Sequence, residues 1–129
     1  MLLNTLSLVA LGGAMGSALR YLVVYAAARC WPQAQLPWGT LLVNLLGSIA
    51  IGLLYVLLVE RHGGSPAWRA LLMTGLLGGF TTFSTFALES ASLWEAGSLA
   101  TALAYMLASL VSCVLGVVLA LALGRTLLL

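Results

Sequence analysis

The sequence predicts an all-α membrane protein with four transmembrane helices. Of its 129 residues, 63% are hydrophobic and only 6% are charged, whereas about a quarter of the residues in a soluble domain are charged. Four stretches without a charged residue, 1–19, 30–59, 70–88 and 96–124, can each hold the roughly 20 apolar residues that cross a bilayer as a helix. These observations together exclude a water-soluble fold.

The four helices are predicted at approximately 4–28, 37–59, 68–94 and 98–123, and they form a single transmembrane domain over residues 1–129. Proline, glycine and charged residues interrupt the apolar pattern between them. The first segment should remain in the mature protein, because its first cation, Arg20, lies well inside the hydrophobic run. With such short connections, neighbouring helices must be antiparallel.

The charged residues limit the partners and give only a weak orientation. A net charge of +2 is too small to indicate binding to nucleic acid or to a polybasic membrane patch. One predicted side of the membrane carries three arginines and the other carries one or two: Arg61, Arg69 and Arg125 against Arg29 and Arg20. This is a weak bias under the positive-inside rule. His62 lies in a predicted loop and is expected to be solvated.

The third apolar segment contains polar residues in the middle of a membrane span. Three glycines in 75–79 are followed by four hydroxyl residues in 81–85. Gly78 and Gly79 weaken a helix and Thr81 and Thr82 can cap a new one, so the pattern predicts a break between two half-helices. Its carbonyls can coordinate a hard cation of the Na⁺ type, and the N-terminus of the second half-helix favours an anion.

All three phenylalanines of the chain fall in this segment, and Phe83 and Phe86 share one helix face. Aromatic rings turned edge-on can stabilise a partly dehydrated anion without a fixed charge that would trap it. Packing alone is the usual explanation of such a pair. The adjacent glycines and hydroxyl residues favour the pathway here.

Other polar residues in the predicted spans have two interpretations each. Asn44 could donate to an anion or make an interhelical hydrogen bond. Tyr105, Ser109 and Ser112 could form a hydroxyl stripe along one path, although serine can also bond its own helix. Arg20 could attract anions at a pore mouth, but a snorkelling or helix-pairing role is favoured. Glu89 is expected to pair with an arginine, in preference to a proton-coupling role.

Small residues at helix-packing spacing suggest oligomerisation, since four helices are too few to enclose a polar path comfortably. The pairs are Gly12 and Gly16, Ser48 and Gly52, and Gly75 and Gly79. Packing within one subunit explains each pair at least as well. No catalytic triad, metal-spaced cluster or phosphate-binding loop is present, so the sequence does not indicate an enzyme.

The chain closely resembles the Fluc (CrcB) family of fluoride channels over nearly its whole length. The residues that carry the resemblance are Gly12-Gly13-Ala14-Met15-Gly16 with Arg20-Tyr21, Gly39-Thr40 with Asn44 and Gly47, and above all 78–86, which reads Gly-Gly-Phe-Thr-Thr-Phe-Ser-Thr-Phe. One departure is Leu76, where many members have phenylalanine.

The resemblance implies an antiparallel, dual-topology homodimer in the inner (plasma) membrane of a microbe that passively exports cytoplasmic fluoride and so lowers its toxicity. It also implies a structural, untransported Na⁺ at the dimer interface, held by the backbone carbonyls of Gly78 and Thr81. The implied partners are therefore fluoride, Na⁺, a second copy of the chain and the lipid bilayer. The implied fluoride pathway comprises Asn44, Phe83, Phe86, Ser84, Thr85, Tyr105 and Ser109.

Two other classes of protein fit only part of the pattern. A small proton-coupled multidrug exporter also has four short helices, but that family's pattern has a glutamate in the first helix, and here no carboxylate precedes Glu60. A membrane scaffold that transports nothing would not explain glycines, hydroxyl residues and phenylalanines gathered at one depth. The sequence favours the channel.

Overall fold

A computed structural model describes residues 2–61 and 63–129, and over these residues the chain is helical with no strands. The elements in chain order are α1 (Leu2–Cys30), α2 (Trp38–Tyr55), the π-helical segment η1 (Val56–Arg61), α3 (Pro66–Trp68), the π-helical segment η2 (Arg69–Leu77), α4 (Gly78–Phe80), α5 (Phe83–Glu95) and α6 (Leu99–Leu128). His62, which was expected to be solvated, lies outside the described residues.

The described residues form four helical spans that are long and apolar enough to cross a membrane: Leu2–Cys30, Trp38–Arg61, Pro66–Glu95 and Leu99–Leu128. The prediction of four transmembrane helices is confirmed. Helix α6 extends five residues beyond its predicted end at 123. Arg125, which was taken to end the apolar run, donates to both carboxylate oxygens of Glu60 over 2.8 and 3.0 Å, so its charge is paired at the end of the helix.

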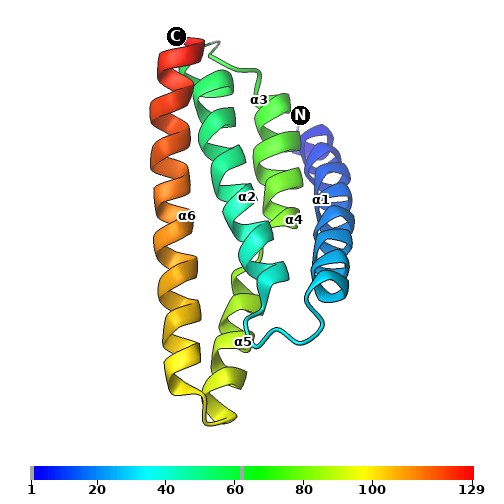
Figure 1. The fold of residues 1–129 in the computed structure, drawn as a ribbon. Coiled ribbons are helices and arrows are strands. Elements are labelled where there is room, and N and C mark those ends of the chain that lie inside the picture. Colours follow the sequence, from blue (N-terminus) through cyan, green and yellow to red (C-terminus); the bar gives the residue numbers. More distant parts are fainter. Residues whose placement is uncertain (1, 62) are drawn as a thin grey trace.

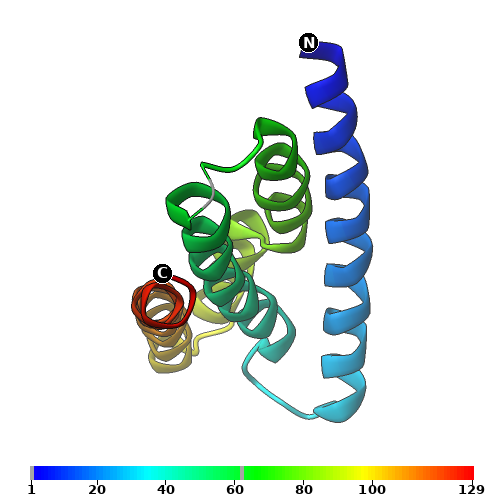
Figure 2. The same ribbon diagram turned by 90° about the horizontal axis from the view of Figure 1, so that it is seen from above.

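The spans run alternately up and down, and both chain ends lie at the same end of the molecule (Figure 1). Helix α2 packs mainly against α6, whereas α1 packs against η2 and α4. Helix α1 is strongly inclined to α6, because α1 appears side-on in the view that shows α6 nearly end-on (Figure 2). The polar centre of the third span therefore has α1 on one side and α2 with α6 on the other.

Glycines bring the backbones of α1 and the third span into direct contact. A Cβ atom added to Gly16 would overlap the Leu76 carbonyl oxygen, and one added to Gly79 would lie 2.5 Å from the Gly13 carbonyl oxygen. A Cβ on Gly75 would lie 2.8 Å from the Val9 carbonyl oxygen. These glycines pack helices within one chain, which answers the question that the sequence left open for them.

Gly16→Ala is expected to lower the free energy of unfolding by about 1–3 kcal/mol, the range for overpacking a tight contact. The added methyl group must push α1 away from Leu76, and the rigid backbone cannot move aside. Gly13→Ala is the matched control, because its Cβ would sit at an ordinary 3.9 Å from the nearest atom. Unfolding in mild detergent measures both variants, and equal stability of the two would contradict the close crossing.

Candidate functional site

Two residues of extended backbone separate α4 from α5 in the third span. Thr81 has φ −81° and ψ 157°, and Thr82 has φ −150° and ψ 116°. The Thr81 N–H still bonds to the Leu77 carbonyl at 3.0 Å, while the Thr82 hydroxyl accepts from the Thr85 N–H at 3.2 Å and so caps α5. The hydroxyl residues of this segment thus begin a new helix in mid-span.

This geometry leaves two backbone carbonyls without their helical partners. In a continuous helix, the N–H groups of Thr82 and Thr85 would bond the carbonyls of Gly78 and Thr81, four residues earlier. Here the Thr82 N–H donates to Asn44 Oδ1 at 2.8 Å and the Thr85 N–H donates to the Thr82 hydroxyl. The two carbonyls that the resemblance assigned to a cation are therefore released from the helix ladder.

Asn44 of α2 holds the extended segment through both halves of its amide. Its Oδ1 accepts from the Thr82 N–H, and its Nδ2 donates to the Thr82 carbonyl at 3.0 Å. The Asn44 amide therefore joins α2 to the third span by hydrogen bonds. This was the alternative to its donation to an anion. The second N–H of Nδ2 is not used by Thr82, so the two roles are compatible.

A groove of about 630 Å³ runs along this segment, between it and helices α2 and α6. It brings together six residues that the sequence selected, namely Asn44, Gly78, Thr81, Phe83, Phe86 and Ser109. Other side chains that line it are mostly apolar, including Met73, Met106 and Val114. An interrupted helix, an amide and two phenylalanines thus share one cavity.

Three aromatic rings form a row that leads from the surface into the protein. Phe83 is 80% exposed, and its ring centroid lies 5.6 Å from that of the half-buried Phe86. The Phe86 ring lies 5.4 Å from that of Tyr105, which is buried on α6. Both pairs are tilted by about 50°, an arrangement in which ring edges as well as faces are presented.

The hydroxyl residues divide between the groove and its edge. Ser109 lines the groove, and its Oγ is buried without a hydrogen-bond partner of good geometry among the described residues. Ser84 and Thr85 are exposed and lie 3.4 and 3.0 Å from the Thr82 hydroxyl, beside the groove. Ser112 bonds the Ser109 carbonyl at 3.4 Å, in accord with the local role considered for it.

Arg20 of α1 lies beside the interruption. Its guanidinium donates to the Thr81 carbonyl at 3.4 Å in a partly buried position. The side chain therefore contacts the third span, as expected for a helix-pairing arginine, and it places a positive charge next to the extended backbone.

Glu89 does not pair with an arginine among the residues that the structure describes, so the expected ion pair was wrong. Its carboxyl group accepts hydrogen bonds from the Thr40 hydroxyl and the Tyr105 hydroxyl, both at 2.7 Å. Thr40 belongs to the Gly39-Thr40 motif of the family resemblance but was given no role of its own. One available signal was spacing, since Thr40 precedes Asn44 by four residues and therefore shares its helix face.

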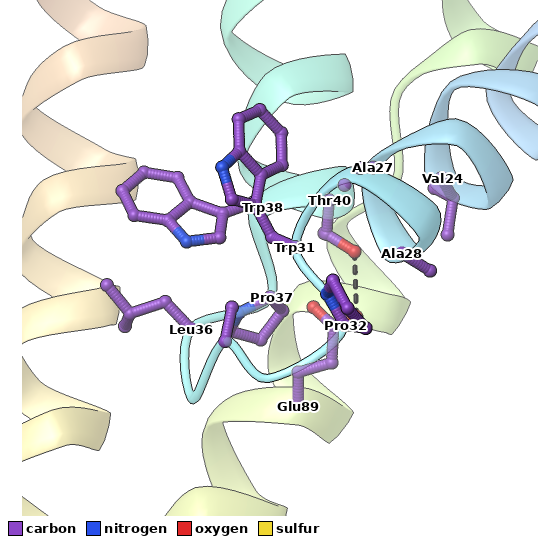
Figure 3. A pocket seen from close by; sticks show the side chains of 12 residues that line it. Val24, Ala27, Ala28, Trp31, Pro32, Leu36, Pro37, Trp38, Thr40 and Glu89 are labelled. Atoms are coloured by element: carbon purple, nitrogen blue, oxygen red, sulfur yellow. Dashed lines mark hydrogen bonds between the residues drawn. The ribbon is translucent and has the colours of Figure 1, made fainter.

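Thr40 and Glu89 also border a second cavity of about 250 Å³ at the end of α1 and the start of α2. Figure 3 shows the hydrogen bond between them, with Trp31, Pro32 and Trp38 around the same space. Thr40 and Glu89 supply the hydroxyl and carboxyl groups of a lining that is otherwise largely alanine, proline and tryptophan.

The fold and this site define a small multi-pass membrane protein whose polar groups gather around an interrupted span. Residues 7–121 match the family described as CrcB-like protein, Camphor Resistance (CrcB), and the chain belongs to this family. It is 50% identical to a protein of Chelativorans sp. over 95% of this chain and 98% of the relative. A protein of Agrobacterium fabrum is 50% identical over 95% and 97%, and one of Paracoccus denitrificans is 51% identical over 95% and 95%.

All three relatives carry the name fluoride-specific ion channel FluC. The resemblance seen in the sequence is thereby confirmed. Membership of a family of channels also agrees with the expectation that the chain is not an enzyme.

Proposed function

We propose that this chain is a fluoride-selective passive channel that exports cytoplasmic fluoride across the inner (plasma) membrane. The observation that carries the proposal is the groove that joins Asn44, Phe83, Phe86 and Ser109 beside the extended Thr81 and Thr82. Relatives at about half identity that bear the fluoride-channel name support it. No observation favours the alternative, a small proton-coupled multidrug exporter.

The chemistry of the groove suits a small anion that must be bound weakly and released. The edges of the Phe83 and Phe86 rings, the N–H of Asn44 that Thr82 does not use and the hydroxyl of Ser109 offer partial positive charge without a fixed cation. The N-terminus of α5 adds the positive end of a helix dipole. Tyr105, Ser84 and Thr85 extend this polar track, and Arg20 raises the local positive potential. Serial weak sites of this kind permit conduction.

A second copy of the chain, in the opposite orientation, completes the pathway in this proposal. Phe83 exposes 80% of its surface at the groove mouth, where a partner would cover it. The nearly balanced arginines of the two sides suit a protein that inserts both ways. Within one chain the close glycine contacts join α1 to the third span, and in this proposal the second copy covers the surface that bears the groove.

The released carbonyls of Gly78 and Thr81 fit a structural Na⁺. Both are hard oxygen ligands without a helical partner, and both residues line the groove. When bound, the ion would supply fixed positive charge at the interface. Arg20 also donates to the Thr81 carbonyl at 3.4 Å, so a bound Na⁺ would share this oxygen with the guanidinium.

Replacing Na⁺ by the larger N-methylglucamine cation is expected to weaken the dimer, because a carbonyl site selects by size and field strength. The mass of the purified protein in detergent, measured by light scattering as the ion is exchanged at constant ionic strength, checks this. K⁺ serves as a second comparison. A dimer that is equally stable in all three solutions would rule out a structural Na⁺.

Growth of a bacterium that lacks its own fluoride exporter tests the proposed function in the cell. Expression of this chain should restore growth in fluoride-containing medium, and Phe86→Ile at equal expression should not. Failure of the wild-type chain to protect would contradict the proposal.

A further inference from the structure

Hydrogen bonds from two neighbouring helices meet on the Glu89 side chain of α5. Thr40 of α2 donates to Oε1 and Tyr105 of α6 donates to Oε2, each at 2.7 Å. The two donors are almost completely buried, with exposures of 1% and 2%. Buried, short bonds to a carboxyl group are stronger than ordinary neutral ones. These three residues are referred to below as the Thr40–Glu89–Tyr105 triad.

Apolar packing contributes little to the placement of α5. Of its thirteen residues, all of them described, Ser90 alone is buried. Leu88, Trp94 and Phe83 are exposed by 69%, 63% and 80%. Packing within one chain therefore holds the rotation of this helix only weakly. Within the chain, the orientation of α5 depends on polar contacts.

The polar contacts hold α5 at two points on opposite sides of its phenylalanines. Asn44 forms hydrogen bonds with Thr82 at the start of α5, and Thr40 forms one with Glu89 seven residues later. The two attachment points are about 10 Å apart along the helix. Thr40 and Asn44 are four residues apart and lie on the same face of α2. Phe83 and Phe86 lie between the two attachment points, so a rotation of α5 would need to break one of them.

We infer that Thr40 and Glu89 are positioning residues that lock the rotation of α5 and so fix the rings of Phe83 and Phe86 at the groove. Tyr105 links Glu89 to the phenylalanine pair, because its hydroxyl donates to Glu89 while its ring lies 5.4 Å from the Phe86 ring. The inference rests on the proposed function for its consequence in conduction. The locking of α5 itself is independent of the ion that passes.

Thr40→Val tests the triad, because valine keeps the shape of threonine and removes only the hydroxyl. Amide hydrogen exchange of peptides from 83–95, measured by mass spectrometry in lipid nanodiscs, is expected to rise about tenfold or more, the factor for losing a hydrogen bond to a charged group. Fluoride efflux from liposomes should fall in parallel. Thr40→Ser, which keeps the hydroxyl, should restore both. Tyr105→Phe keeps the ring and should resemble Thr40→Val.

Thr74→Val is the matched control, because Thr74 is exposed on η2 and the same chemical change there should alter neither measurement. Exchange in α5 that stays unchanged in both Thr40→Val and Tyr105→Phe would overturn the locking role. Faster exchange with unchanged fluoride efflux would overturn the role in positioning the rings. Absence of fluoride efflux from the wild-type protein would instead contradict the proposed function, and the exchange comparison would still decide whether the triad holds α5.

Discussion

Phe86→Ile and Phe83→Ile are each expected to lower fluoride flux by up to about tenfold while the dimer stays folded. Isoleucine retains bulk in the groove but removes the positive ring edge, and an aromatic contact worth up to about 1.5 kcal/mol corresponds to about a tenfold change in rate. The Phe86 substitution should have the larger effect, because it also removes the ring that contacts Tyr105. Fluoride efflux from liposomes measures both variants.

Leu88→Ile is the control for these substitutions. Leu88 belongs to the same helix and is 69% exposed, but it does not line the groove. Its efflux should equal that of the wild type. Undiminished fluoride flux in both phenylalanine variants would reduce Phe83 and Phe86 to packing residues.

Asn44→Ala is expected to damage both stability and conduction. The buried Thr82 would lose the partners of its N–H and its carbonyl, and each unsatisfied backbone group costs about 1–3 kcal/mol. The loss of both partners is therefore expected to lower the free energy of unfolding by about 2–6 kcal/mol. Fluoride flux should fall as well, because α5 loses the attachment that fixes its first turn.

Asn4→Ala is the matched control, since Asn4 is the other asparagine of the chain and is exposed near the start of α1. It should behave as the wild type in denaturation and in efflux. Asn44→Ala with wild-type stability would show that the amide does not hold the extended segment.

The sequence was sufficient for the helices because each span is long and nearly free of charge. Apolar length and interrupting residues determine where a membrane helix begins and ends, which is why the predicted spans agree closely with α1, α2 with η1, and the third span. The predicted end of α6 at 123 was too early because the uncharged stretch stops before Arg125. Its pairing with Glu60 joins residues 65 positions apart, and no local pattern contains that information.

The candidate site was partly predictable for a similar reason. Glycine, threonine and phenylalanine are adjacent in 78–86, so their chemistry is visible in one short run. The partners of Glu89 were not visible, because Thr40 and Tyr105 reach it from two other helices whose rotation is set by packing. The double use of the Asn44 amide likewise depends on where α2 crosses the extended Thr82.

Fluoride efflux from liposomes that contain the purified protein, compared with chloride efflux under the same voltage and with no proton gradient, tests the central claim most directly. The structure, with its uncharged groove of ring edges, amide and hydroxyl groups, predicts rapid fluoride efflux and no chloride efflux above that of empty liposomes. Equal permeation of the two anions, or no fluoride efflux, would contradict it.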